Sequence, residues 1–369
     1  MAVITEGLIT FDFFQKKITM RIATLLILLL WMHGSIFSQN TQRVATDYFQ
    51  QQPHLSIRAL QVCSDQTVWF AANNGVYGFT RDGGKTWHTD SIAVEGKYPE
   101  FRSIAALNDS TVLLLSIDSP AYMFKTYDYG KNWRTVFANH APKIFFDALY
   151  FKDAQHGIAV SDPADGCFRM IMTHNGGETW QQIPCKALPA AYDGEACFAA
   201  SNSTVWWQGN HLRFVTGGKH SRLFVSDDGA SFTALPAPVV SGEELTGIFT
   251  TDFANAQTGY IGGGNYLKND SSIVTLFKTT DGGHHWTALP LPGNAFVSSV
   301  KILSGTNLTA VTGMQGTYAI DNKGKAVEWL DENGSSLPFY ALSYAPGSHY
   351  LWMAGSKGRI ARLKLNWQK

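Results

Sequence analysis

Two arginines and an aspartate occupy the same place in three short apolar runs of this 369-residue sequence. The runs IRALQV, FRSIAAL and FFDALYF begin at residues 57, 101 and 145, and they align Arg58, Arg102 and Asp147. Neighbouring guanidinium groups bind carboxylates through paired hydrogen bonds, so these arginines could hold an acidic peptide tail. An internal ion pair, in which Asp147 and Glu195 satisfy the arginines, would explain the same residues without a ligand.

Carboxylates at Asp162 (in VSDPADG) and Glu195 (in DGEACF) fall in loops between expected strands. Together with Asp147 they could form the carboxylate pair that glycoside hydrolysis requires. Such residues more often brace turns by accepting backbone hydrogen bonds, so we assign no catalytic residue. The sequence therefore gives a hypothetical binding site at one mouth of a central channel, formed by Arg58, Arg102, Asp147, Asp162 and Glu195.

Other motifs that carry chemistry are incomplete. The stretch TRDGGKTW (80–87) contains Gly-Lys-Thr, but Phe79 stands where a phosphate-binding loop needs its first glycine. The stretch GGGNYL (262–267) lacks the last glycine of a dinucleotide-binding turn, and no Cys-x-x-Cys occurs. His284 and His285 are adjacent in a turn and point to opposite sides, which argues against a shared metal. The sequence indicates neither a cofactor nor a metal site.

The stretch TRDGGKTW is one of five related turns. TYDYGKNW, THNGGETW, VSDDGASF and TTDGGHHW begin at residues 126, 173, 225 and 279 and follow the frame Ser/Thr-x-Asp-x-Gly-x-x-Trp. Asn175 replaces the aspartate once, Val225 the first hydroxyl residue once, and Phe232 the tryptophan once. The nearly regular interval between the first residues of these turns indicates a repeat array or a propeller. The residues at the acidic and aromatic positions are Asp82, Trp87, Asp128, Trp133, Asn175, Trp180, Asp227, Phe232, Asp281 and Trp286.

The chemistry of this frame favours a structural clasp over a catalytic site. The carboxylate can accept backbone N–H groups of the turn, and the glycine supplies a positive φ. The hydroxyl two residues before the carboxylate braces the same turn, and the aromatic residue packs under the hairpin.

Short β-rich runs between the clasps complete the repeat. Seven first strands are expected to begin at residues 57, 101, 145, 196, 246, 296 and 339, each followed by three further strands. Thr246, Ser298 and Tyr340 are expected to match Arg58 in the later units. The sequence thus predicts an all-β, seven-bladed propeller over residues 39–369. The last unit lacks an outer strand, which TQRVATDYFQQ (41–51) is placed to supply, closing the ring.

The repeated turn resembles the BNR or Asp-box repeat of sialidases and sortilin-type receptors. The phrases EFRSIAAL, GIAVSDP, GEACFAASN and GSKGRIARL are more similar to the photosystem II stability/assembly factor family, in particular to its non-photosynthetic bacterial relatives. This resemblance covers residues 39–369 and implies a propeller that binds proteins and helps to assemble a membrane complex. It does not imply sialidase activity, because the Arg-Ile-Pro motif of sialidases is absent.

The N-terminal segment predicts export. Basic residues up to Arg21 precede the apolar run IATLLILLLWM (22–32), and the small residue Ser38 fits a cleavage point. We expect a signal peptide over residues 1–38, with Met20 as a possible true start and an uncleaved anchor as the alternative. The protein would then be periplasmic or extracellular, with no transmembrane span after signal removal.

Export places the four cysteines in an oxidising compartment. Cys63, Cys167, Cys185 and Cys197 allow three pairings. Cys185 with Cys197 is the pair to test first, and Cys63 is expected to be a buried thiol.

These observations predict an exported protein-binding scaffold, or an assembly or stability factor for an envelope complex. The alternative is a carbohydrate-active enzyme or glycan-binding propeller that uses the same face. Lysine plus arginine and aspartate plus glutamate both total 29, which argues against a nucleic-acid partner.

Overall fold

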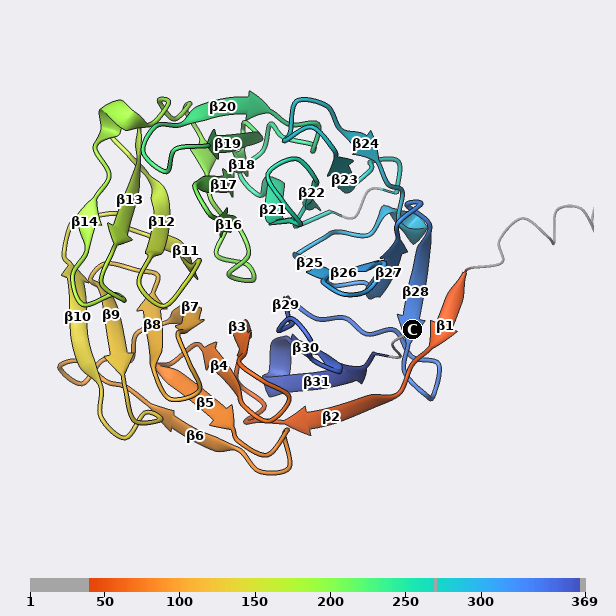
Figure 1. The fold of residues 1–369 in the computed structure, drawn as a ribbon, viewed down its shortest axis with the longest axis horizontal. Coiled ribbons are helices and arrows are strands. Elements are labelled where there is room, and N and C mark those ends of the chain that lie inside the picture. Colours follow the sequence, from red (N-terminus) through yellow and green to blue (C-terminus); the bar gives the residue numbers. More distant parts are fainter. Residues whose placement is uncertain (1–39, 269–270, 366–369) are drawn as a thin grey trace, which may run out of the picture. The chain divides into compact units, whose positions relative to one another are not determined.

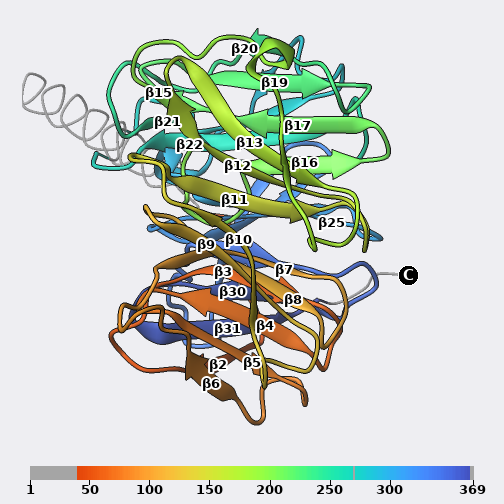
Figure 2. The ribbon, with the colours of Figure 1, turned by 90° about the vertical axis from the view of Figure 1, so that its left-hand side faces the viewer.

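The computed structural model describes residues 40–268 and 271–365. The expected signal segment lies outside these residues. Seven sheets stand around a common centre, as predicted, and no α-helix is found in the described part of the chain (Figure 1). Seen from the side, strands of successive blades lie next to one another (Figure 2).

Blades 1 to 3 are regular four-stranded meanders. Blade 1 contains β3 (Ile57–Val62), β4 (Val68–Ala72), β5 (Val76–Thr80) and β6 (His88–Ser91). Blade 2 contains β7 (Phe101–Ala106), β8 (Val112–Ser116), β9 (Ala121–Thr126) and β10 (Arg134–Asn139). Blade 3 contains β11 (Phe146–Phe151), β12 (Gly157–Ala164), β13 (Cys167–Thr173) and β14 (Gln181–Gln182).

Blades 4 to 7 vary this plan. Blade 4 contains β16 (Val205–Gln208), β17 (His211–Val215), β19 (Arg222–Ser226) and β20 (Thr233–Pro236). Blade 5 contains β21 (Thr246–Phe253), β22 (Gly259–Asn265), β23 (Leu276–Thr279) and β24 (Thr287–Ala288), and is extended by β18 (Gly217–Gly218) and β15 (Glu195–Ala196). Blade 6 contains β25 (Ser299–Leu303), β26 (Leu308–Thr312), β27 (Thr317–Asp321) and β28 (Ala326–Leu330). Blade 7 contains β29 (Ala341–Ser343), β30 (Tyr350–Ala354) and β31 (Arg359–Lys364).

The N-terminal segment closes the ring. β2 (Thr46–Gln50) pairs antiparallel with β31 as the outer strand of blade 7, which confirms the prediction (Figure 1). The preceding β1 (Thr41–Arg43) pairs parallel with β28 and adds a fifth strand to blade 6. One short stretch of chain therefore ties two blades together and covers the outer edge of each.

Hydrophobic side chains fill the space between adjacent blades. Trp352 of blade 7 packs with Phe70 of blade 1, and Trp69 of blade 1 packs with Phe101 of blade 2; all four are fully buried. Similar clusters lie between the other neighbouring blades. Burial of apolar surface therefore joins each blade to the next, and the ring depends on all of these contacts.

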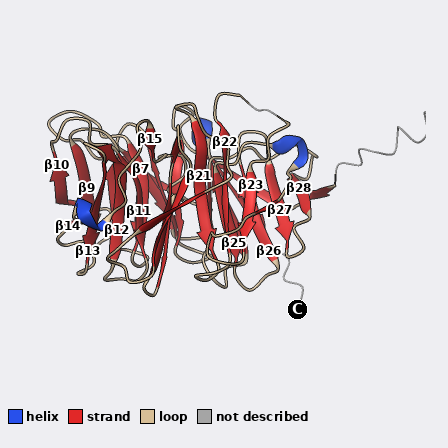
Figure 3. Cartoon of the chain, turned by 90° about the horizontal axis from the view of Figure 1, so that it is seen from above, coloured by secondary structure: helices blue, strands red, loops and turns tan. Residues whose placement is uncertain are grey.

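The loops lie at two faces of the ring (Figure 3). The face at which the inner strands begin carries the loops between blades and the hairpins between second and third strands. We call it the mouth face. The opposite face carries the repeated turns, and we call it the clasp face.

The turns at the clasp face share one hydrogen-bond pattern. The Thr80 hydroxyl accepts the Gly84 N–H at 2.8 Å and donates to Asp82, and the Asp82 carboxylate accepts the Thr86 N–H at 2.9 Å. The hydrogen bonds of Thr86 lower the pKa of Asp82 to about 2. The turns that begin at residues 126, 173 and 279 repeat the same bonds.

In the turns that begin at residues 80, 126, 173 and 279, the glycine at the fifth position lies against the preceding blade. A side chain at Gly84 would meet the Phe49 ring at 2.6 Å, and one at Gly130 would meet Tyr77 at 2.9 Å. Gly177 and Gly283 lie equally close to leucines of the blade before them. The aromatic residue of the turn follows the same direction, since Trp133 contacts Tyr77 with ring centroids 4.9 Å apart. Each clasp therefore closes its own hairpin and also docks onto its neighbour.

The fourth turn is shifted by one residue from the prediction. Asp228, not Asp227, accepts the turn N–H groups of Ala230 and Ser231, and Ser226 supplies the hydroxyl. The turn is one residue shorter than the others, so the aligned frame selects the wrong aspartate. Asp227 instead pairs with Arg213 at 2.8 Å.

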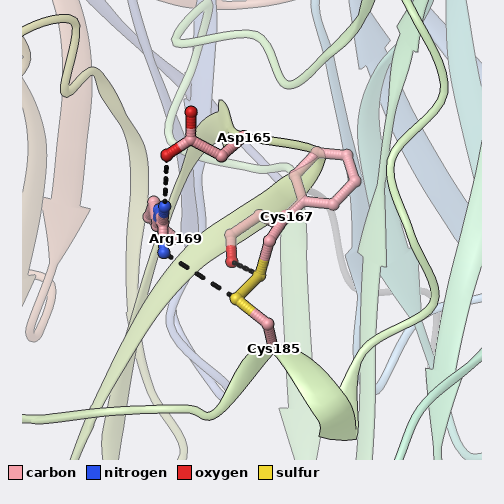
Figure 4. The surroundings of a disulfide bond; sticks show 5 residues. Asp165, Cys167, Arg169 and Cys185 are labelled. Atoms are coloured by element: carbon pink, nitrogen blue, oxygen red, sulfur yellow. Dashed lines mark hydrogen bonds and ion pairs between the residues drawn. A yellow bond between two sulfur atoms is a disulfide. The ribbon is translucent and has the colours of Figure 1, made fainter.

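The expected pairing of Cys185 with Cys197 is wrong. The disulfide joins Cys167 to Cys185, with Cα atoms 5.8 Å apart, beside the Asp165–Arg169 ion pair (Figure 4). Cys167 begins β13 and Cys185 follows β14, which is the neighbouring strand, so the two meet directly. Cys197 is a buried free thiol in the interior. Cys63 is also free, but it is half-buried rather than buried; burial raises its pKa to about 12.

Candidate functional site at the channel mouth

Three of the five candidate residues lie at β-bulges of the inner strands. Arg58, Arg102 and Asp147 are each the second residue of their strand, and in each case the register with the second strand slips at that residue. A bulge re-aims the extra side chain, which explains why these three share a position near the mouth. The predicted alignment of these residues is therefore found in the structure. In blade 5 the bulged residue is Phe249, not the expected Thr246.

The predicted first strand of the fourth blade is wrong. Residues 197–204 form no strand, and the inner strand is β16 further along the chain. Residues 198–203, which we call the plug, cross the central channel instead. The plug contacts five other blades, as its hydrogen bonds show.

Asn202 is the central residue of the plug. Its side-chain amide donates to the Ile104 carbonyl of blade 2 at 2.8 Å and accepts the Leu149 N–H of blade 3 at 2.9 Å. Its φ is +57°, a conformation that asparagine tolerates better than most residues. Asn202 thus satisfies backbone groups on the inner edges of two sheets that have no further strand to pair with.

The remaining plug residues contact the other side of the ring. The Ser201 hydroxyl donates to the Ser298 carbonyl of blade 6 at 2.6 Å. The Ser203 hydroxyl lies 2.7 Å from that of Thr250 in blade 5. Both serine side chains are therefore used to hold the plug in place.

An aromatic cluster lies beside the plug. Phe198 stacks on Phe249 with ring centroids 3.9 Å apart, and Phe296 and Tyr266 pack against them. Phe198 comes from the plug, whereas the other three come from blade 5 and the segment before blade 6. The plug and this cluster together fill the channel near the mouth.

The two arginines have separate partners. Arg58 lies over the Tyr340 ring of blade 7, 4.4 Å from its centroid, and reaches across the channel toward the Ala200 carbonyl at 3.4 Å. Arg102 forms an ion pair with Glu100 at 2.6 Å. The structure therefore does not join the two guanidinium groups into one binding fork, although Arg102 keeps 28% of its side chain exposed.

Asp147 is a buried carboxylate with few polar groups to stabilise its charge. Neither oxygen has a hydrogen bond of ordinary geometry, although the N–H groups of Asp162 and Ala199 are near enough to lower its pKa. Burial raises the pKa of Asp147 well above its usual value, the Asp162 carboxylate raises it further, and Arg102 opposes this rise.

Asp162 lies beside Asp147 and is also largely buried. Its carboxylate accepts the Cys197 N–H at 2.8 Å, and burial raises its pKa to about 6. Burial and the surrounding carboxylates raise the pKa of the Cys197 thiol as well. The structure thus brings together Asp147 and Asp162, and it adds Cys197, which the sequence did not single out.

Glu195 belongs to an internal ion pair, but not with the expected partners. It binds Arg222, whose Nε lies 2.8 Å from one carboxylate oxygen, and it accepts the Thr216 hydroxyl at 2.6 Å. Arg222 in turn lies under the Tyr192 ring, 4.0 Å from its centroid. Asp147 and Glu195 are both buried, so in this structure neither carboxylate is within reach of a sugar at the mouth face.

Exposed apolar side chains gather on the mouth face, a feature that sequence reasoning missed. Among the described residues, seven large hydrophobic side chains are exposed, and five of them lie on loops of this face. They are Tyr98, Tyr192, Leu245, Leu267 and Met314. Leu245 and Leu267 lie on adjoining loops, because the Tyr266 N–H donates to the Leu245 carbonyl. The loops of the mouth face share no repeated sequence pattern, so sequence reasoning could not find these residues.

Within residues 40–268 and 271–365, no group of three histidine, cysteine, aspartate or glutamate side chains is placed to hold a metal ion. The same residues contain no helix that is long and apolar enough to span a membrane.

Comparisons with known proteins agree on the fold. No family model and no curated protein matches the sequence. A solved structure of YCF48 bound to a D1 peptide is similar to this chain, with a TM-score of 0.66 at 14% identity, covering 89% of this chain and 99% of that one. YCF48 from Cyanidioschyzon merolae gives a TM-score of 0.62 at 14% identity, covering 87% and 99%. Virginiamycin B lyase from Staphylococcus aureus, with quinupristin, gives 0.63 at 10% identity, covering 87% and 100%. Identities this low show the propeller fold alone.

Proposed function

We propose that this chain is an exported propeller that binds another protein through its mouth face, as a scaffold or assembly factor for an envelope complex. We further propose that it is a distant, non-photosynthetic relative of the photosystem II assembly factors and that its clasps are BNR or Asp-box repeats. The similar YCF48 structure contains a bound D1 peptide, which supports a peptide or protein as the ligand here.

The gathering of exposed apolar side chains on one face carries this proposal. Exposed large apolar side chains mark sites of protein contact when they adjoin, as on the loops of Leu245 and Leu267. The clasp face exposes few such residues, and the plug and aromatic cluster fill the channel near the mouth. A partner would therefore contact the loops around the mouth rather than enter the channel.

Capture of partners from an envelope extract tests the proposal. The bait is the chain from residue 40 onward, compared with a variant carrying Tyr98→Glu and Leu267→Glu on the mouth face. Both side chains are exposed, so the variant should keep its melting temperature. The matched control is Lys85→Glu, an exposed position on the clasp face.

We expect one partner to be retained by the wild type and by the control, and to be lost from the mouth-face variant. Cross-links from this partner should map to the loops of the mouth face. A partner that the folded mouth-face variant binds as well as the wild type would contradict the proposed face. A glycan array run beside the capture, on the wild type and on the mouth-face variant, tests the carbohydrate alternative, which requires that a glycan bind the wild type and be lost from the mouth-face variant.

Export has its own test. The protein purified from its natural source should begin near Gln39, because Ser38 fits the residue before a cleavage point. N-terminal sequencing that finds residues 1–19 intact would contradict a cleaved signal.

A further inference from the structure

The central channel contains a cavity of about 590 Å³ on the clasp-face side of the plug. Every blade contributes the last residues of its inner strand to the lining, and Ser201, Asn202 and Ser203 form the floor. This volume lies within the range of small-molecule sites, roughly 300–1,000 Å³. We call this cavity the funnel. It lies at the other end of the inner strands from Arg58 and Arg102.

Three polar side chains from three blades converge in the funnel. Lys301 of β25 forms an ion pair with Asp252 of β21 at 3.2 Å, and Tyr150 of β11 also lines the cavity. Asp252 is held in place because one of its carboxylate oxygens also accepts the Ile302 N–H at 2.8 Å. The side chain of Lys301 is 31% exposed, so part of it faces the funnel, whereas that of Asp252 is only 8% exposed.

The three groups interact electrostatically. Burial raises the pKa of Tyr150, Lys301 acts to lower it and Asp252 acts to raise it. Burial acts to lower the pKa of Lys301, but Asp252 and Tyr150 outweigh it, so the net shift is upward. At neutral pH the site therefore presents an ammonium group, which is paired with Asp252, and a neutral phenol hydroxyl.

The charges of Lys301 and Asp252 cancel. A ligand with a net charge would leave one charge uncompensated inside the cavity, which is unfavourable at low dielectric. A neutral hydroxyl can instead accept from the ammonium group and donate to the carboxylate without separating the ion pair. The amides of Gln61 and Gln208 add further donors and acceptors to the lining. Alternating donors and acceptors of this kind match the vicinal hydroxyl groups of a sugar ring.

We propose that the funnel binds a short neutral saccharide, with its hydroxyl groups on Lys301, Asp252 and Tyr150. This site is distinct from the mouth face and does not depend on the function proposed above. Loss of sugar binding with partner capture intact, or the reverse, would separate the two proposals.

Calorimetric titration and saturation-transfer NMR on the chain from residue 40 onward test the site. The probes are glucose, galactose, N-acetylglucosamine, maltose, cellobiose and chitobiose, with glutamate and inorganic phosphate as charged comparators. The variants are Tyr150→Phe, which removes only the hydroxyl, and Lys301→Gln. The control is Lys97→Gln, an exposed lysine in a loop of the mouth face.

We expect at least one neutral saccharide to bind with a dissociation constant of ~1 mM or below. Tyr150→Phe should weaken it roughly tenfold, the effect of one hydrogen bond of ~1.4 kcal/mol, and the control should bind as the wild type does. If Lys301→Gln fails to fold, Tyr150→Phe and the exposed Gln208→Ala still report on the site.

Three results would overturn the proposal. One is that none of the six saccharides binds at concentrations up to ~10 mM. Another is that glutamate or phosphate binds more tightly than any of the sugars. The third is that folded Tyr150→Phe and Gln208→Ala both bind the sugar with unchanged affinity.

Discussion

At the clasp face, four turns repeat the same hydrogen bonds and pack in the same way on the preceding blade, whereas at the mouth the plug occurs only once. The hydroxyl and carboxylate groups of the clasps bond with neighbours in sequence, although the indole N–H groups of Trp87, Trp133 and Trp286 are buried without ordinary hydrogen bonds. The plug satisfies its polar groups with residues from distant blades, and it leaves Asp147 beside it buried without ordinary hydrogen bonds.

The difference separates two requirements of a propeller. The repeated clasp turns specify the hairpins and the packing of one blade on the next, and any blade can contain such a turn. A single segment that crosses the channel can be specified only by long-range contacts. Residues at the mouth have therefore departed from the repeat, and such departures are where functional or strained sites are expected.

The largest effect is expected at a clasp glycine. In Gly84→Ala the new Cβ would meet the Phe49 ring of β2 at 2.6 Å, at a φ of +93°. Steric overlap and backbone strain together should cost roughly 2–4 kcal/mol in the free energy of unfolding. Because β2 closes the ring, the loss should be seen in the global unfolding transition. Chemical denaturation, followed by tryptophan fluorescence, measures it.

Gly96→Ala is the matched control. Its φ is +76°, but a new Cβ meets nothing within 4 Å. The cost should be limited to about 1 kcal/mol of backbone strain. Equal losses in the two variants would show that backbone strain, rather than contact with the preceding blade, explains the clasp glycine.

A smaller loss is expected in the plug. Asn202→Gly keeps the positive φ but removes the hydrogen bonds to Ile104 and Leu149. Leaving these buried backbone groups without partners should cost about 2 kcal/mol. Asn74→Gly is the control, because Asn74 has nearly the same φ of +58° and lies exposed in a turn. If the two variants were equally stable, the side chain of Asn202 would not hold the plug.

The contrast between the two faces also explains which features the sequence could predict. Repetition identifies the clasps and the number of blades, because local residues determine the hairpins, and the missing fourth strand of the last unit identifies the closing strand. The sequence alignment selects Asp227 instead of Asp228 as the aspartate of the fourth turn. This turn is one residue shorter than the others, and the alignment does not reveal the missing residue. The disulfide was mispredicted because strand pairing, not spacing, decides which cysteines meet.

The site was predictable only where it follows the repeat. Arg58, Arg102 and Asp147 were aligned correctly because their strands share one pattern. The plug looks like a strand, since CFAASN mixes apolar and small residues as the true inner strands do. Only the contacts of Asn202 with two distant blades distinguish the plug, and no local pattern encodes them.

The smallest effect is expected from the carboxylates beside the plug, and it depends on pH. Burial raises the folded-state pKa of Asp162 to about 6 from its ordinary value of 3.8, so between these values the folded state binds more protons than the unfolded state. Its contribution to stability is thus fully present below about 3.8 and is lost as the pH rises through about 6. The clasp carboxylates act in the opposite sense, because the lowered pKa of Asp82 makes stability fall only in strong acid.

Asp162→Asn isolates this effect. The asparagine carbonyl can still accept the Cys197 N–H, but it carries no charge to be buried. Above pH 6 the variant should be more stable than the wild type, and the difference should vanish near pH 4. Melting temperatures of the two proteins across this range measure the difference.

Asp82→Asn should show the reverse dependence, with any loss of stability present at neutral pH and shrinking in acid as the wild-type carboxylate becomes protonated. A constant offset between wild type and Asp162→Asn at every pH would mean that the burial of Asp162 does not couple to its protonation. The response of stability to acid would then come from the clasps and not from Asp162 at the mouth.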